Sequence, residues 1–326
     1  MTETTQQLAQ KVLDQVETAV VGKREPLTLT LAAILAGGHV LLEDLPGLGK
    51  TLTARSFAQA LGLDFARAQF TPDLLPADLT GAYVYDQSSG QFQFRRGPLF
   101  TGLMLADEIN RTPPKTQSAL LEAMAEKQVT VEGRTFTLDR PFHVLATSNP
   151  VEYEGTYPLP EAQLDRFLLR LSFGYPEAGD EQEILRRRLA RQREELTLEP
   201  ATDAAGLLAM QQAVEAIPVE DDISAYCVRL AAATRRAPGV QVGASPRGSL
   251  ALILVARAYA VISGRDYIIP EDVKAVAHPV LDHRIVLKPE LWMSDTRPAQ
   301  ITQKVLSEVP VPAARAADAV AGDAQG

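Results

Sequence analysis

Residues 40–51, with the sequence VLLEDLPGLGKT, decide the fold that the rest of the chain builds. The first four can form a buried strand, a turn rich in Pro and Gly follows, and residues 52–61 have a helical pattern. A strand, a loop of small residues and a helix in this order are typical of a phosphate-binding loop, because the backbone N–H groups of the loop can surround phosphate oxygens. We expect Lys50 to reach the terminal phosphates and the Thr51 hydroxyl to hold Mg²⁺.

One position departs from the general pattern G-x-x-x-x-G-K-[ST] of such loops. Asp44 stands where the pattern has its first glycine, so Gly47 and Gly49 must supply the flexibility of the loop. The alternative interpretation of the stretch is an ordinary glycine-rich turn between a strand and a helix.

The composition is that of a globular protein with room for two domains or one large one. The formal net charge of −9 argues against a protein whose main task is to coat nucleic acid or an anionic membrane. Cys227 is the only cysteine, which excludes an intrachain disulfide and a thiolate metal cluster. The sequence begins without the features of a signal peptide, and its longest apolar region, residues 27–42, is too short to span a bilayer. We therefore expect a cytoplasmic protein without a membrane segment.

Short apolar runs alternate with helical patterns in the first half of the chain. Buried strands are expected at residues 40–43, 65–70, 102–106, 142–147 and 167–173. This alternation predicts the α/β class, with a parallel five-stranded sheet covered by helices on both faces. Ligands in such folds bind at the carboxyl ends of the strands.

The character of the sequence changes near residue 175, after which helical patterns dominate. We therefore divide the chain into an α/β nucleotide-binding core at residues 1–175, an all-helical domain at residues 176–309 and a disordered tail at residues 310–326.

Two segments of the core have the alternation of a β-hairpin. In residues 82–94, aromatic side chains recur at every second position on both sides of a Ser-Ser-Gly turn, and residues 128–138 repeat the pattern with apolar side chains. The sequence leaves open whether these are surface ribbons packed on the core or contacts for a partner.

The predicted strand at residues 102–106 leads into two carboxylates, Asp107 and Glu108. A carboxylate at the end of a strand can bind the Mg²⁺ of a phosphate-loop site, usually through water, and an adjacent one can orient or deprotonate the attacking water. We assign Asp107 to the metal and Glu108 to the water. An acidic loop after a strand is the ordinary alternative, but the coincidence with Lys50 and Thr51 favours a functional pair.

The next predicted strand leads into Asn149, whose neutral amide could hydrogen-bond both the γ-phosphate and the attacking water. The dipeptide Asn149-Pro150 is also an ordinary turn signal, and the local residues alone favour the turn.

Two arginines stand out by their positions. Arg166 opens the last predicted strand, and Arg247 follows Ser245 and Pro246 at the expected start of a helix. A cation in the first turn opposes the helix dipole, so either a phosphate or a carboxylate of the core should hold Arg247 there. The arginine-rich run at residues 186–193 is balanced by glutamates, and we interpret it as a solvated helix face.

Several longer motifs occur together along the chain. They are LMLADEINRTPPKTQSALLEAMAEKQVTVEG at residues 103–133, QFTPDLLP at 69–76, ATSNP at 146–150, LPEAQLDRF at 159–167 and GASPR at 243–247. On these motifs the chain resembles the MoxR family of AAA+ ATPases, over roughly residues 5–305, and the first motif closely matches the signature of that family.

The resemblance implies a set of catalytic residues. They are the Walker B glutamate Glu108, sensor 1 at Asn149, the arginine finger at Arg166 and sensor 2 at Arg247, which a helical lid carries. Arg166 would reach the nucleotide of the neighbouring subunit, and Arg170 is the alternative finger.

The resemblance also implies which residues bind the cofactors, ATP and Mg²⁺. The nucleotide-binding set is Val21, Gly22, Pro46, Gly47, Leu48, Gly49, Lys50, Thr51, Leu52 and Asp107. Of these, Val21 and Gly22 would line the adenine pocket, and Thr51 and Asp107 would hold the metal. Asp44 fits this family, in which an Asp-x-Pro-Gly run is common.

The function that the resemblance implies is ATP hydrolysis in a homo-oligomeric ring, a hexamer. Hydrolysis at each subunit interface would rotate the lid against the core through Arg247 and move the two hairpins, which would contact a client protein. In this family the client often carries a von Willebrand factor A domain, so the implied role is that of a chaperone that remodels the client or assists its metal or cofactor insertion. No direct contact with nucleic acid is expected.

Four alternatives share parts of this pattern. The motor subunit of a magnesium chelatase belongs to the same clade, but the signature at residues 107–126 favours the MoxR family. A DNA-dependent AAA+ motor would share the site, yet the acidic balance disfavours it. A switch-type GTPase would need an N-K-x-D motif, which the sequence lacks. A binding module without hydrolysis is disfavoured by the intact Glu108.

Overall fold

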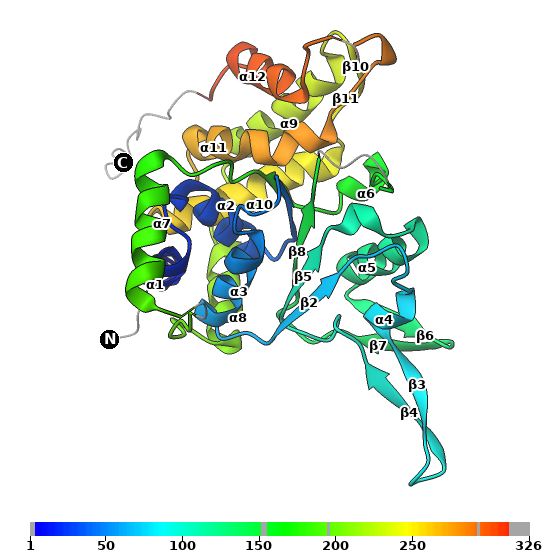
Figure 1. The fold of residues 1–326 in the computed structure, drawn as a ribbon. Coiled ribbons are helices and arrows are strands. Elements are labelled where there is room, and N and C mark those ends of the chain that lie inside the picture. The colour runs from blue at the N-terminus through cyan, green and yellow to red at the C-terminus, as the bar shows by residue number, and fades with distance from the viewer. Residues whose placement is uncertain (1–3, 151–154, 194–195, 292–293, 313–326) are drawn as a thin grey trace, which may run out of the picture.

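The computed structural model describes residues 4–150, 155–193, 196–291 and 294–312. Figure 1 shows an α/β core, a set of helices packed against it and a hairpin that projects from the core. The tail predicted to be disordered from Pro310 lies outside the described residues from position 313 onward. Within the described part of the chain, no helix is both long and apolar enough to cross a bilayer.

The core contains a sheet of five parallel strands in the order β2-β5-β8-β1-β9. The strands are β1 (Val40–Glu43), β2 (Phe65–Gln69), β5 (Leu103–Asp107), β8 (His143–Ser148) and β9 (Leu169–Leu171). Each overlaps one of the apolar runs of the sequence, and every residue of β5 is buried, as expected for a central strand covered on both faces. The predicted α/β class and the parallel five-stranded sheet are confirmed.

Alternate residues of the strands enter two separate hydrophobic clusters, one on each face of the sheet. In β1, Val40 and Leu42 pack in the larger cluster, whereas Leu41 packs in the smaller one. The larger cluster includes side chains of α1 (Thr5–Ala19), α2 (Arg24–Leu35) and α3 (Lys50–Ala60), and the smaller one those of α5 (Pro114–Glu126), on the opposite side of the sheet (Figure 1). The predicted covering of both faces by helices is therefore confirmed.

Beyond β9 the chain is mainly helical. The helices are α7 (Ala178–Arg191), α8 (Ala204–Glu215), α9 (Asp221–Arg236), α10 (Pro246–Ile262), α11 (Pro270–Leu281) and α12 (Pro298–Glu308). A short antiparallel ribbon of β10 (Val240–Val242) and β11 (Val286–Leu287), which the sequence analysis did not predict, lies among them. Because the larger hydrophobic cluster continues from the core into these helices, the division near residue 175 stays a prediction.

Two antiparallel hairpins belong to the core. After the short helix α4 (Pro76–Thr80), β3 (Gly81–Asp86) pairs with β4 (Gln91–Arg96), and β6 (Gln128–Val131) pairs with β7 (Arg134–Thr137). Figure 1 shows the β3–β4 hairpin projecting beyond the rest of the molecule.

The two hairpins contact each other through their side chains. Phe94 of β4 stacks on Phe136 of β7 with ring centroids 4.2 Å apart, and Arg134 donates a hydrogen bond to the Tyr83 hydroxyl at 3.2 Å. They therefore form one unit. Farther along the first hairpin, Phe92 is 68% exposed, which leaves a large aromatic side chain on the surface.

Two buried histidines lie at the amino edge of the sheet. Nδ1 of His39, just before β1, accepts a hydrogen bond from the Val144 N–H at 3.0 Å, and its Nε2–H donates to the Met124 carbonyl oxygen at 3.2 Å. His143 begins β8, and its Nδ1 lies 2.9 Å from the Gly38 carbonyl oxygen. Burial lowers the pKa of His39 to about 3 and the pKa of His143 to about 4, so both imidazoles are neutral at pH 7.

These histidines predict a loss of stability in mild acid. Below about pH 6.5 the unfolded chain binds protons at both positions, whereas the folded chain does not until about pH 4 for His143 and about pH 3 for His39. The free energy of unfolding should therefore fall between pH 6.5 and pH 4, by up to about 1.4 kcal/mol per pH unit for each histidine. Urea unfolding at pH 7, 6 and 5 measures this slope.

The matched control is His39→Asn, which keeps an acceptor near the position of Nδ1 but cannot titrate. Carboxylates contribute to the pH dependence of the unfolding free energy in both the native chain and the variant. The difference between the two slopes therefore gives the contribution of His39. We expect a shallower slope in the variant, and identical slopes would contradict the prediction.

Candidate functional site

A cavity of about 340 Å³ lies at the carboxyl edge of the sheet, between the β1–α3 loop and the ends of β5 and β8. Its lining consists of Pro46, Gly47, Gly49, Lys50, Thr51, Leu52, Asp107, Glu108 and Asn149. All of these are residues that the sequence assigned to the site. Parallel pairing brings their three segments together, because the chain leaves each of these strands at the same edge.

The β1–α3 loop has the backbone that a phosphate cradle requires. Gly47 and Gly49 have φ values of +82° and +79°, in the left-handed region that other residues rarely adopt. Helix α3 begins at Lys50, immediately after Gly49, so the unpaired N–H groups of its first turn and the positive end of its dipole lie at the cavity. Such a helix start favours bound anions.

Asp44, the departure from the general loop pattern, anchors the loop to the end of β9. Its carboxylate is buried and accepts hydrogen bonds from the Ser172 hydroxyl at 2.7 Å and from the N–H groups of Phe173 and Gly174. Its backbone carbonyl oxygen accepts a hydrogen bond from Lys50 Nζ. The carboxylate therefore fixes the start of the loop with contacts that a glycine could not make.

Asp44→Gly restores the general pattern, yet we expect it to weaken the site. The change removes the hydrogen bonds to a buried carboxylate, each worth about 1.5–3 kcal/mol, and leaves buried donors without an acceptor. The free energy of unfolding should fall by about 3 kcal/mol, and a fluorescent ATP analogue should bind at least roughly tenfold more weakly. Asp44→Asn keeps an acceptor oxygen, so its stability and nucleotide affinity should lie between those of the native chain and Asp44→Gly. An Asp44→Gly variant with native stability and affinity would contradict this role.

One hydroxyl organises the two carboxylates that follow from β5. Thr147 of β8 donates a hydrogen bond to Asp107 Oδ1 at 2.7 Å and accepts one from the Glu108 N–H at 2.8 Å. Glu108 has φ 58° and ψ 51°, a left-handed conformation that costs a residue other than glycine about 1–2 kcal/mol. The hydrogen bond to Thr147 stabilises this conformation, which turns the Glu108 side chain toward the cavity instead of continuing the strand.

Both carboxylates also accept hydrogen bonds from side chains outside the predicted set. Glu108 Oε2 accepts from Gln69 Nε2 at 2.8 Å and from Arg111 Nη1 at 2.9 Å. Asp107 Oδ2 accepts from Arg67 through Nε at 3.1 Å and Nη2 at 2.7 Å. These contacts hold both carboxylates in place and leave Glu108 Oε1 and part of Asp107 Oδ1 able to accept further hydrogen bonds.

Thr147→Val tests the organising hydroxyl, because valine has nearly the same shape and neither donates nor accepts. We expect the ATPase kcat to fall by about tenfold or more through the displacement of Glu108, with a smaller change in ATP affinity. Steady-state kinetics measure both quantities. Thr147→Ser keeps the hydroxyl and should retain most of the activity; equal activity of the two variants would contradict the assignment.

The structure places the two predicted arginines away from this cavity. Arg166 precedes β9 and therefore lies at the amino edge of the sheet, about one strand length, roughly 13 Å for the four residues of β1, from the loop. A second cavity of about 280 Å³ at that edge brings Arg166 together with Arg247 and Lys127. In the described part of the chain, the side chains of Arg166 and Arg247 make no hydrogen bond or ion pair.

Arg170, the alternative finger, has a partner within the chain. It lies in β9, and its Nη1 is 3.4 Å from Glu43 Oε2. Val21 and Gly22 lie in the turn between α1 and α2 and, like Leu48, do not line the cavity around Lys50. Their roles stay predictions.

Comparisons with known proteins decide the family. The model of the ATPase family associated with various cellular activities (AAA) matches residues 39–169, and an AAA lid domain model matches residues 232–305. The chain is 41% identical to Chaperone MoxR1 of Mycobacterium tuberculosis, over 93% of this chain and 82% of that protein. It is 34% identical to Protein MoxR of Methylorubrum extorquens, over 91% of this chain and 93% of that protein. The chain belongs to the MoxR family of AAA+ ATPases.

A solved structure supports the same assignment. A Cytophaga hutchinsonii protein, described as a candidate ATPase, matches with a TM-score of 0.88 and 40% identity, over 95% of this chain and 96% of that chain. The resemblance to MoxR proteins that the motifs predicted is confirmed, and with it a nucleotide-binding chain with ATPase activity, a chaperone-like family and a helical lid.

Sequence reasoning missed the polar residues that support the MoxR site. Asp44 was identified only as a departure, and Thr147, Gln69, Arg67 and Arg111 were not singled out. Thr147 gave a usable signal, since it lies on the strand next to β5, two residues before Asn149. Asp44, Gln69 and Arg67 gave none, because their partners are distant in sequence, whereas Arg111 pairs with Glu108 only three residues before it.

Proposed function

We propose that this MoxR protein is a Mg²⁺-dependent ATPase that assembles into a ring, a hexamer, in which each nucleotide cavity is completed by the neighbouring copy. The observation that carries the proposal is the second cavity, where Arg166, Arg247 and Lys127 gather at the edge of the sheet opposite Lys50. With Arg284, the lining of that cavity has four cations but two carboxylates, Glu126 and Asp165, so its excess positive charge would stabilise a bound anion. The triphosphate of an adjacent copy is such an anion.

The proposal changes the expected role of Arg247. The sequence analysis assigned it as sensor 2, carried by the helical lid. The structure instead places it in the cavity that Arg166 lines, and Arg247 does not line the cavity around Lys50. We therefore assign both arginines to the nucleotide of the neighbouring subunit.

The cavity lining suits a triphosphate and its cation. Lys50 and the N–H groups of the loop complement the phosphates, and the Asn149 amide lies within the same cavity for the γ-phosphate. Asp107 already accepts three hydrogen bonds, one at Oδ1 and two at Oδ2, so Oδ1 can accept one more, from a metal-bound water. Thr51 and Asp107 would hold Mg²⁺, which supplies charge neutralisation at the phosphates.

Glu108 is the group that handles the attacking water. Its Oε2 is held by Gln69 and Arg111, which leaves Oε1 to accept a hydrogen bond from water in the cavity. As the water oxygen bonds to the γ-phosphorus, its proton passes to Glu108 and the bond to the β–γ bridging oxygen breaks, giving ADP and phosphate. Arg166 of the neighbour would stabilise the charge that develops on the transferred group.

We further propose that the work is done on a client protein in the cytoplasm, with the joined hairpins as the contact. The exposed Phe92 on the projecting β3–β4 hairpin supports this, as does the similarity to a protein named as a chaperone. A client with a von Willebrand factor A domain, whose metal site is assembled or remodelled, is the partner class that the family resemblance favours.

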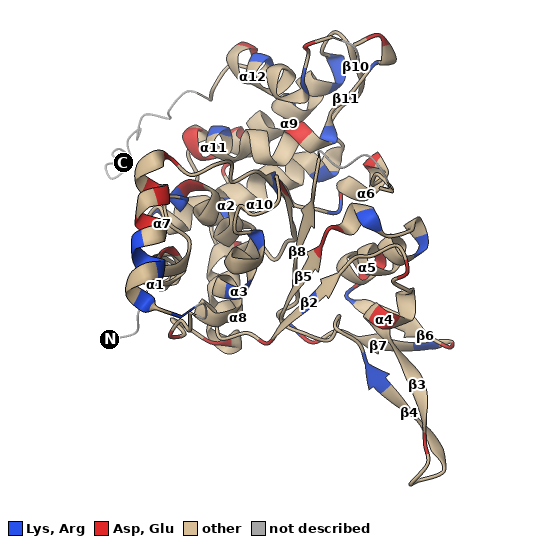
Figure 2. Ribbon diagram, in the orientation of Figure 1, with Lys and Arg blue, Asp and Glu red and all other residues tan. Residues whose placement is uncertain are grey.

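A motor that acts on DNA, or a magnesium-chelatase-type motor, remains the second candidate by resemblance, but no observation favours either. Figure 2 shows Asp and Glu in the first half of α7, the helix with the arginine-rich run, and Arg in its second half. In that helix Glu183 pairs with Arg186 and Arg187, each at 2.6 Å. Paired charges of this kind do not form the continuous basic surface that a nucleic-acid backbone requires.

Mixing two inactive variants tests the shared site. Arg166→Ala keeps its own nucleotide cavity but supplies no finger, and Glu108→Gln supplies a finger but has no catalytic carboxylate. Each alone should lose about 10³-fold or more in turnover. In randomly mixed rings, roughly a quarter of the interfaces combine the two intact halves, so up to roughly a quarter of the native ATPase activity should return.

The oligomeric state provides the second measurement. Sedimentation with a non-hydrolysable ATP analogue should show a ring for the native chain and for both variants. A protein that stays monomeric with nucleotide at all concentrations, yet turns over at full speed as Arg166→Ala, would falsify the proposal.

A further inference from the structure

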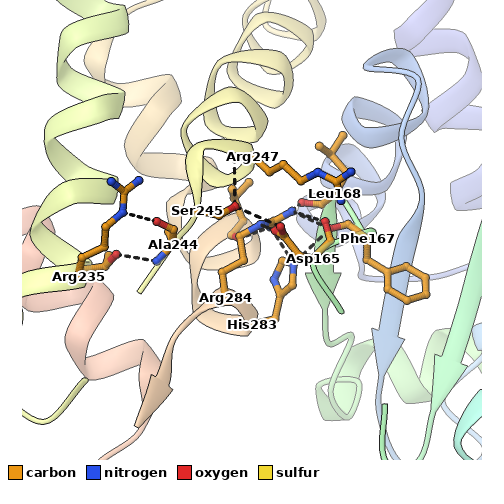
Figure 3. A network of polar contacts seen from close by, with 11 residues as sticks. Asp165, Phe167, Leu168, Arg235, Ala244, Ser245, Arg247, His283 and Arg284 are labelled. Atoms are coloured by element: carbon orange, nitrogen blue, oxygen red, sulfur yellow. Dashed lines mark hydrogen bonds and ion pairs between the residues drawn. The ribbon is translucent and has the colours of Figure 1, made fainter. Parts of the chain in front are cut away.

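We propose that Asp165 and Arg284 are positioning residues through which the helical lid holds Arg166 and Arg247 in one fixed arrangement. This inference rests on the proposed function, since it concerns how the arginines supplied to the neighbouring cavity are held. It assigns a task to a buried polar network that the nucleotide cavity does not use (Figure 3).

Arg284 reaches out of the lid to the segment that contains Arg166. It lies in the 3-10 turn Asp282–Arg284 after α11, and its side chain is 3% exposed. Nε donates to Asp165 Oδ1 at 2.7 Å, Nη2 to the Phe167 carbonyl oxygen at 2.8 Å, and Nη1 to the Leu168 carbonyl oxygen at 3.3 Å. The guanidinium therefore holds the residues immediately before and after Arg166.

Asp165 connects the same segment to the helix that carries Arg247. Its Oδ2 accepts a hydrogen bond from the Ser245 hydroxyl at 3.1 Å, and Ser245 is the N-cap of α10. The Arg247 N–H donates to the same hydroxyl at 3.2 Å. One carboxylate thus has Arg284 on one oxygen and the start of α10 on the other, as Figure 3 shows.

The segment has little freedom apart from the Arg166 side chain. The ring of Phe167 is fully buried in the smaller hydrophobic cluster, and its carbonyl oxygen also lies 3.2 Å from His283 Nε2. Leu169, which follows in β9, is buried in the larger cluster. With the residues on both sides fixed, the backbone position of Arg166 is set by the contacts with the lid.

The charges explain why a carboxylate is needed at this point. Burial lowers the pKa of Arg284, the proximity of Asp165 opposes this effect, and nearby Arg247 adds to it. Without Asp165, the buried guanidinium would lose its ion-pair partner and remain close to two further arginines, with Glu126 as the carboxylate left in the cavity lining. The half-buried Arg166 and the exposed Arg247 could then no longer be held in the same cavity.

The network does not reach the nucleotide cavity of its own chain. Its residues lie at the amino edge of the sheet, and none of them lines the cavity around Lys50. A change in Asp165 should therefore leave nucleotide binding by the same subunit intact and impair the site of its neighbour. A purely structural role in attaching the lid would not separate these two effects.

The test uses Asp165→Asn and Arg284→Lys, with Arg265→Lys as the matched control. Arg265 forms an ion pair within the lid with Asp272, whose side chain is 1% exposed, and its guanidinium hydrogen-bonds to Asp272 and not to residues 165–168. We expect both test variants to bind a fluorescent ATP analogue with native affinity and to lose about tenfold in kcat. The control variant, Arg265→Lys, should keep the native nucleotide affinity and the native kcat. Ser245→Ala, which removes only the link to α10, gives a milder change if the other variants do not fold.

Mixing variant subunits distinguishes a positioning role at the neighbour's site from a loss of function within the variant's own subunit. Asp165→Asn mixed with Glu108→Gln should regain activity several-fold above the average of the two, because Glu108→Gln supplies a correctly held finger. Asp165→Asn mixed with Arg166→Ala should regain no ATPase activity, because neither variant supplies a correctly held arginine finger.

Three outcomes would overturn the inference. Native turnover of Asp165→Asn, Arg284→Lys and Ser245→Ala would remove the positioning role. A loss that Glu108→Gln does not relieve, although it relieves the loss in Arg166→Ala, would show that the network only stabilises its own subunit. If the mixture of Arg166→Ala and Glu108→Gln regains no ATPase activity, the shared site is refuted, and the positioning role that depends on it is refuted as well.

Discussion

A constraint of parallel strands governs this molecule: the segment before a strand and the segment after it lie at opposite edges of the sheet. The phosphate-binding loop follows β1, whereas Arg166 precedes β9, and these two strands are hydrogen-bonded neighbours. The chain therefore cannot bring Arg166 to its own Lys50. Two copies that contact each other head to tail can, since the amino edge of one then faces the carboxyl edge of the next.

Each edge has a polar network, with at least one buried member, that sets the geometry of its half of the site. At the carboxyl edge, Asp44 fixes the loop and the Thr147 hydroxyl fixes both carboxylates after β5. At the amino edge, Asp165 joins two parts of the lid to the segment with Arg166. Buried groups of this kind are costly unless every partner is present, so each network defines one arrangement and disfavours others.

The sequence predicted what local patterns and strand direction determine. The five strands are visible as apolar runs, and the residues after them converge in one cavity because parallel strands end at one edge. The location of Arg247 could not be predicted in this way, because it depends on how the lid packs against the core. Asp44 likewise gave no sign of its role, since its partners are 128 to 130 residues away.

Strand β9 connects the two halves of the site within one subunit. Before it lie Asp165 and Arg166, which the lid holds, and directly after it lie Ser172 and Phe173, which bind the Asp44 carboxylate beside the phosphate-binding loop. The strand is also hydrogen-bonded to β1 along its length. The phosphate-binding loop is therefore connected, through β9 and the carboxylates of Asp44 and Asp165, to the segment that contains Arg166. In the proposed ring, such a connection would couple successive cavities through the edge strand β9.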